Sequence, residues 1–166
     1  MLERTGVPTI KDLKSVMPSE ERLNKGPVAV IECFQNIPCN PCYTACNRNA
    51  IKEFDDINDL PNIDHEVCNG CGLCVSKCPG LAIMVMDMAY SENEALLKIP
   101  YEFLPLPKEN DYVRGLDREG KYVCDVRVIK VMNPKAFDKT PILSIAVNKE
   151  FAKIVRNIGM GDEDGR

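Results

Sequence analysis

Short hydrophobic stretches separated by polar segments run along this chain, and most of them have the length of strands. Residues 121–132 alternate between apolar and polar side chains, which is the period of a strand with one buried face. Other apolar runs are four to eight residues long and end at turn-forming residues. The predicted strands are 28–33, 81–88, 94–103, 121–132 and 142–147.

Predicted helices are few and short. Polar residues and prolines over residues 1–26 predict an extended leader with one helical turn near 19–22. Short turns of helix are expected after Cys42 and after Cys74, and a short closing helix over 150–156. Residues 116–120 are predicted to form a polar turn that ends in glycine.

Composition narrows the class of protein. Hydrophobic residues make up 45% of the 166 residues and charged residues 28%, so a folded core is expected. The net charge of −4 argues against a nucleic-acid partner. No apolar run has the length of a membrane span, and the first residues lack a signal peptide, which predicts a cytoplasmic protein.

Nine cysteines are unusual for a protein expected in a reducing compartment, where clustered thiols bind metals more often than they form disulfides. Four of them form Cys68-x-x-Cys71-x-x-Cys74-x-x-x-Cys78-Pro79, the spacing of bacterial ferredoxins. In this arrangement the first three thiolates bind one [4Fe–4S] cluster and the fourth binds a second cluster. Two structural zinc sites would also use eight thiols, but zinc sites usually show separated C-x2-C pairs.

An internal repeat supplies the second cluster. A shift of 32 residues carries Cys39, Cys42 and Cys46 onto the last three cysteines of the later motif. Crosswise ligation then predicts two sets of ligands. Cluster 2 is held by Cys46, Cys68, Cys71 and Cys74, and cluster 1 by Cys39, Cys42, Cys78 and one further group.

The fourth ligand of cluster 1 is not given by the repeat, because Asn36 stands where Cys68 stands in the later motif. We predict Cys33, six positions before Cys39, as this ligand. A non-cysteine ligand and a three-iron cluster are the alternatives. Cys124 lies in a predicted strand and is interpreted as a structural thiol. His65, the only histidine, is interpreted as a surface turn residue.

Residues 26–83 resemble the dicluster ferredoxin family through both cysteine motifs. The segments 28–33, 37–42 and 68–83 are similar to small iron–sulfur subunits of anaerobic, flavin-dependent amine or amino-acid dehydrogenase complexes of the proline and hydroxyproline type. This resemblance extends to residues 123–156 and implies a hetero-oligomer with flavin-containing oxidoreductase subunits and a small [2Fe–2S] subunit. It implies no chemistry on a substrate by this chain itself.

The predicted fold class is α+β. We expect an N-terminal extension at 1–26, a dicluster ferredoxin-like domain at 27–100, a small β-barrel or β-sandwich domain at 101–160 and a tail at 161–166. No nucleotide- or flavin-binding motif and no nucleophile elbow occurs. The function predicted is electron transfer through two [4Fe–4S] clusters. The alternatives are a free-standing ferredoxin carrier, a zinc-stabilised interaction module and a cluster protein that senses redox state for nucleic acid.

Overall fold

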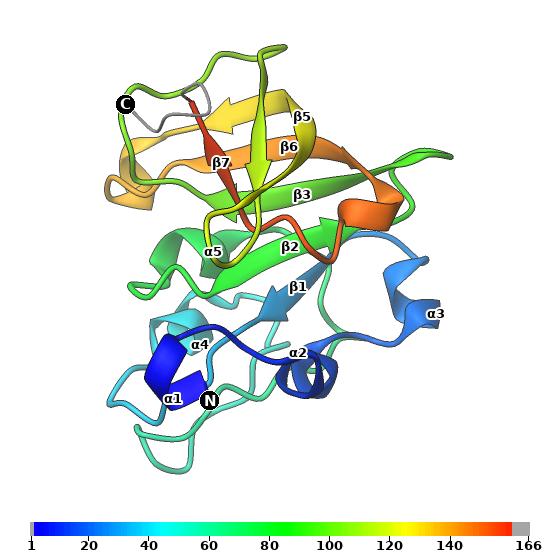
Figure 1. The fold of residues 1–166 in the computed structure, drawn as a ribbon. Coiled ribbons are helices and arrows are strands. Elements are labelled where there is room, and N and C mark those ends of the chain that lie inside the picture. The colour runs from blue at the N-terminus through cyan, green and yellow to red at the C-terminus, as the bar shows by residue number, and fades with distance from the viewer. Residues whose placement is uncertain (1, 161–166) are drawn as a thin grey trace.

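The computed structural model describes residues 2–160, and its main feature is one seven-stranded antiparallel sheet (Figure 1). The strand order is β1-β2-β3-β6-β5-β4-β7. The strands are β1 (Val28–Ile31), β2 (Ile83–Asp87), β3 (Glu94–Pro100), β4 (Tyr112–Leu116), β5 (Tyr122–Met132), β6 (Ile142–Asn148) and β7 (Asn157–Gly159). All five predicted strands are present with slightly different ends, while β4 and β7 were not predicted.

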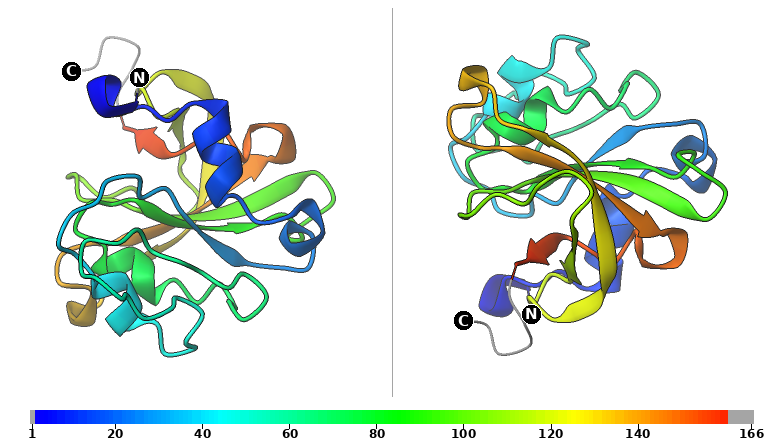
Figure 2. Two further views of the ribbon diagram at one scale, coloured as in Figure 1. Left: turned by 90° about the horizontal axis from the view of Figure 1, so that it is seen from below. Right: turned by 90° about the horizontal axis from the view of Figure 1, so that it is seen from above.

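Helices are short and lie outside the sheet. They are α1 (Leu2–Thr5), α2 (Ile10–Val16), α3 (Glu20–Leu23), α4 (Pro41–Ala45) and α5 (Leu73–Lys77), with 3-10 turns η1 (Lys135–Phe137) and η2 (Lys149–Phe151). Figure 2 shows α4, α5 and the cysteine-bearing loops on one side of the sheet, and α1 and α2 on the other side, where the sheet ends in β7. None of the helices in the described part of the chain combines the length and apolar character needed to cross a membrane.

Burial on both faces explains why β1 and β2 are nearly continuous apolar runs. Val28, Val30, Met84 and Met86 face a core shared with β3 to β7. The alternate residues of the same two strands, such as Ile31 and Ile83, face a second core beneath the cysteine loops. The second core also contains Cys42 and Cys74, so the sheet forms the floor of the thiol-bearing region.

Two local predictions were wrong. The N-terminal segment is not extended, because α2 forms there with a capping box in which the Thr9 side chain accepts from the Asp12 amide and the Asp12 carboxylate accepts from the Thr9 amide. Residues 150–156 do not form a helix beyond the 3-10 turn at Lys149–Phe151. There the chain turns so that β7 can pair with β4, which buries Val155 completely.

The predicted boundary at residue 100 falls within a continuous sheet. Strand β3 pairs with β6 along its whole length, from Glu94↔Asn148 to Pro100↔Ile142. The division into a ferredoxin-like domain and a β-barrel or β-sandwich domain stays a prediction, and the predicted tail at 161–166 lies outside the described residues.

Candidate metal centres

The sequence repeat reappears in the backbone pairing of the two halves. Ile31 pairs with Ile83 where β1 meets β2, and an isolated bridge joins Ile51 to Ile63. A shift of 32 residues carries Ile31 onto Ile63 and Ile51 onto Ile83. Each half therefore pairs its first apolar segment with the last apolar segment of the other half.

Two backbone hydrogen bonds follow the same exchange. The Glu32 amide donates to the Ala82 carbonyl at 2.8 Å, and the Asp64 amide donates to the Ala50 carbonyl at 2.8 Å. These two bonds are also related by the shift of 32 residues. The exchange carries the last cysteine of each motif toward the opposite half, which is the arrangement that crosswise ligation requires.

One set of four thiols lines a single cavity. Cys33, Cys39, Cys42 and Cys78 are all in its walls, and apolar side chains complete them. Burial first, and then the neighbouring thiols of Cys78, Cys39 and Cys33, raise the pKa of the Cys42 thiol to about 11. Cys33 therefore lies beside the three thiols it was predicted to join. We call this set group 1.

The other predicted set also gathers in one place. Burial first, and then the nearby thiols of Cys68, Cys71, Cys46 and Cys42, raise the pKa of the Cys74 thiol to about 12. Cys74 is buried, whereas Cys71 is exposed. We call Cys46, Cys68, Cys71 and Cys74 group 2. Cys42 of group 1 and Cys74 of group 2 belong to the same buried core, so the two groups are neighbours.

Backbone amides point at several of these sulfurs. Cys68 Sγ accepts from the Ala29 amide at 3.4 Å and from the Gly70 amide at 3.5 Å. Cys46 Sγ accepts from the Ile51 amide at 3.5 Å, and Cys78 Sγ accepts from the Ala82 amide at 3.4 Å. Such N–H donors stabilise a thiolate and tune the metal group that it binds.

Glycine is required at one point of the group 2 loop. Gly70 has φ +64°, and a Cβ there would lie 2.5 Å from Pro27 Cβ and 2.7 Å from the Pro27 carbonyl carbon. Gly72 has φ +89° and precedes α5. The two glycines let the loop turn tightly while it packs against the residue that leads into β1.

These donor sets fit a [4Fe–4S] cluster, which takes one thiolate at each of four irons. Each group offers four free thiols, with amide donors to sulfur from adjacent backbone. In the described part of the chain, no three His, Cys, Asp or Glu side chains converge where a single metal ion would bind. The thiols of each group are thus close to one another, but they do not converge on the position of a single ion.

A largely covered ion-pair network borders group 1. Glu32, the residue before Cys33, accepts from Arg118 at 2.7 and 2.8 Å and from Arg156 Nε at 2.7 Å. Burial alone would favour the protonated acid, but hydrogen bonds and charge from the two arginines lower the pKa of Glu32 overall. This network ties the turn after β4 and the segment before β7 to the start of the group 1 loop.

His65 and Cys124 are not members of either group. His65 is half-buried rather than a surface residue, and its Nε2 has no hydrogen-bond partner among the described residues. Burial and the positive charge of Arg22 lower its pKa, so the ring is neutral at pH 7. Cys124 is in β5 and packs against the core of the sheet, as its interpretation as a structural thiol predicted.

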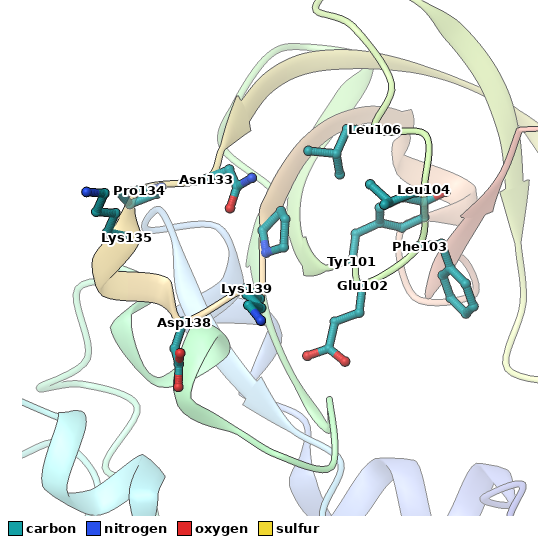
Figure 3. Close-up of a pocket in the computed structure, with 11 residues that line it drawn as sticks. Tyr101, Glu102, Phe103, Leu104, Leu106, Asn133, Pro134, Lys135, Asp138 and Lys139 are labelled. Atoms are coloured by element: carbon teal, nitrogen blue, oxygen red, sulfur yellow. The ribbon is translucent and has the colours of Figure 1, made fainter.

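A separate hollow of about 610 Å³ lies between the segment after β3 and the turn around η1 (Figure 3). It is lined by Tyr101, Phe103 and Leu104 on one side and by Lys135 and Lys139 on the other. None of the cysteines lines it. We therefore leave it out of the metal centres.

Residues 61–84 match the model of the 4Fe–4S binding domain. This segment includes Cys68, Cys71, Cys74 and Cys78. The chain contains a 4Fe–4S binding domain. No solved structure matches the chain.

Several curated proteins are similar to part of this chain. The ferredoxin-type protein NapF of Haemophilus influenzae is 36% identical over 61 residues, which is 36% of this chain and 35% of NapF. NapF of Escherichia coli K12 is 33% identical over 52 residues, 30% of this chain and 32% of NapF. The pyruvate synthase subunit PorD of Methanocaldococcus jannaschii is 40% identical over 47 residues, 28% of this chain and 52% of PorD. The chain thus spans about a third of the length of NapF and half of PorD.

Three residues beside the 4Fe–4S domain were not singled out from the sequence: Arg22, Glu32 and Pro27. The sequence does contain a signal for Glu32: it is a charged residue directly after the apolar run 28–31. A carboxylate next to a buried strand needs a partner of opposite charge. Nothing local marks Arg22 or Pro27, since their contacts are with the loop that begins at Cys68.

Proposed function

We propose that this chain is an electron-transfer subunit that carries two [4Fe–4S] clusters, bound by group 1 and group 2. The observation that supports two clusters is the cavity lined by Cys33, Cys39, Cys42 and Cys78. The 4Fe–4S model covers only the later motif, whereas this cavity gathers thiols from both. When bound, each cluster supplies reversible one-electron uptake.

The chain's own residues would hold and shield these groups. Thiolates of group 1 are covered by apolar side chains such as Ile31, Phe54 and Ile83, which keep water from the cavity. The Ala29 and Gly70 amides stabilise the charge on Cys68. Ligands from both halves keep the two groups adjacent, which suits passage of an electron between them.

We further propose that the electrons come from a flavin-containing oxidoreductase subunit in the same complex and leave to an acceptor. The resemblance of segments 28–33, 37–42 and 68–83 to small subunits of flavin-dependent dehydrogenases supports this. Similarity to PorD, which is named as a subunit, favours a complex over a free-standing carrier. Purification without oxygen should recover a flavoprotein with the chain, and recovery of the chain alone would favour the free carrier.

The first experiment is to measure iron, acid-labile sulfide and zinc per chain in protein purified without oxygen. About eight iron and eight sulfide are expected for two cubanes. About four of each would limit the chain to one cluster, and a colourless protein with zinc would support the interaction module instead.

The ligand role of Cys33 is tested separately. Cys33→Ser should reduce the iron content by about half, because only group 1 loses a ligand. Cys124→Ser is the matched control, since Cys124 belongs to neither group, and its iron should be unchanged. Full iron content and unaltered spectra in Cys33→Ser would mean that a non-cysteine ligand completes group 1.

A further inference from the structure

A buried arginine binds the loop that begins group 2. Arg22 in α3 is 7% exposed. Its guanidinium donates to the carbonyls of Cys68 at 2.6 Å, His65 at 2.7 Å, and Gly26 and Pro27 at 3.1 Å each. One of these acceptors belongs to a predicted cluster ligand, so the charge lies against the cluster-binding loop.

Carbonyls satisfy the hydrogen-bonding groups of Arg22 but do not neutralise its charge. Among the ion pairs of the described residues, none includes Arg22. A buried charge without a counter-charge is costly. A cluster with four thiolate ligands carries net negative charge, and it would supply the missing counter-charge beside Arg22.

A second cation reaches the same loop from the sheet. The Lys98 ammonium, from β3, donates to the Gly70 carbonyl at 2.9 Å and is half-buried. The Gly70 amide in turn donates to Cys68 Sγ. No ion pair with a carboxylate involves Lys98 in the described part of the chain. Arg22 and Lys98 therefore place two unpaired positive charges around one loop.

Group 1 has a different charge environment. Two largely covered cations that border it, Arg118 and Arg156, share the carboxylate of Glu32. A further carboxylate, Asp59, is in the wall of the group 1 cavity. Two carboxylates thus offset the two arginines beside group 1, whereas Arg22 and Lys98 beside group 2 have no carboxylate partner in the described part of the chain.

We propose that Arg22 and Lys98 raise the reduction potential of the group 2 cluster above that of the group 1 cluster. This inference rests on the proposed function. Reduction adds one negative charge to a cluster, and a nearby cation in a poorly solvated region stabilises that charge. Electrons that enter at group 1 would then pass to group 2 and leave near Cys71, the exposed thiol of that group.

The test is a redox titration of the cluster-loaded chain, followed by electron paramagnetic resonance. Wild-type protein should show two midpoints, and the higher one should be the signal altered in Cys71→Ser. Arg22→Met should move that midpoint to more negative potential and leave the other in place. Arg22→Lys, which keeps the charge but cannot make all four hydrogen bonds, should stay close to wild type.

Lys25→Met is the matched control, because Lys25 is an exposed cation directly after α3 that pairs with Glu21 and Glu66. It should move neither midpoint. Lys98→Met should shift the group 2 midpoint in the same direction as Arg22→Met. If Arg22→Met does not fold, the midpoint of Lys98→Met tests the inference in its place.

Two results would overturn the inference. One is a loaded Arg22→Met or Lys98→Met protein with both midpoints unchanged, and the other is a higher midpoint that belongs to group 1. A wild-type protein without iron and sulfide would instead overturn the proposed function itself.

Discussion

The two groups of thiols are held by unlike stretches of chain. Group 2 depends on a tight loop with glycines at positions 70 and 72, followed at once by α5. Group 1 begins at Cys33 and reaches Cys39 through five residues without regular structure. Short-range geometry therefore forms most of group 2, whereas group 1 needs the rest of the fold to bring its thiols together.

The two groups also differ in which parts of the chain surround them. Group 2 is contacted by α3 and β3, which lie close to it through Arg22 and Lys98. Group 1 is bordered by Glu32, whose partners Arg118 and Arg156 come from the far end of the chain. A damaged C-terminal segment should therefore affect group 1 before group 2.

The largest expected effect on iron content comes from replacing the last cysteine of each motif, because each of these cysteines is predicted to bind the cluster of the other group. Cys78→Ser lies in the later motif but should remove the group 1 cluster, and Cys46→Ser lies in the earlier motif but should remove the group 2 cluster. Each should cost about half of the iron, because each cluster loses one of four ligands. Cluster-specific spectra would show which group remains. Loss of the cluster of the same motif in either variant would contradict crosswise ligation.

A smaller effect is expected from Glu32→Gln. This change leaves the largely covered Arg118 and Arg156 without their shared carboxylate, at a cost of about 3 kcal/mol in the free energy of unfolding. Denaturant unfolding would measure the cost, and the iron of group 1 should be lost before that of group 2. Glu119→Gln, at an exposed pair with Lys121, should change stability by under about 1 kcal/mol. Equal stability in both variants would show that the Glu32 network does not hold group 1.

Gly70→Ala should have the smallest effect of the three, and only on group 2. The new Cβ would overlap Pro27 and force a left-handed backbone on alanine, which should cost about 2 kcal/mol of folding stability. The group 2 cluster should be released sooner on exposure to chelator, while group 1 is unchanged. Gly80→Ala is the control, because a Cβ there meets no atom within 4 Å. Identical release in the two variants would mean that the close approach to Pro27 is not needed.

The sequence was informative where structure depends on neighbours in the chain. Alternation and short apolar runs located five strands, and cysteine spacing predicted groups that the structure brings together, including Cys33 with its three neighbours. The predicted boundary at residue 100 was drawn from a change in composition. No local pattern indicated that Glu94–Pro100 would pair with Ile142–Asn148 across more than forty residues.

The contacts of single charged residues could not be predicted from local sequence patterns either. Arg22 has exposed neighbours at Glu21 and Asn24, and only its tertiary contact with the loop at Cys68 buries it. Arg156 is similar: its side chain is only 11% exposed, because the chain turns after Phe151 to place β7 beside β4. Strand β4 was missed because Arg114 and Gly115 interrupt its apolar character.

The continuous sheet has a consequence for synthesis of the chain. All eight group 1 and group 2 cysteines lie before residue 79, yet β3 gains its second neighbour only when β6, at Ile142–Asn148, has been made. Until the ribosome has translated that strand, β3 is an unpaired edge with Ala95, Leu97 and Ile99 uncovered. Synthesis of the cysteine-bearing segments and closure of the sheet are therefore separated in time, and the nascent chain is most prone to aggregate in the interval between them.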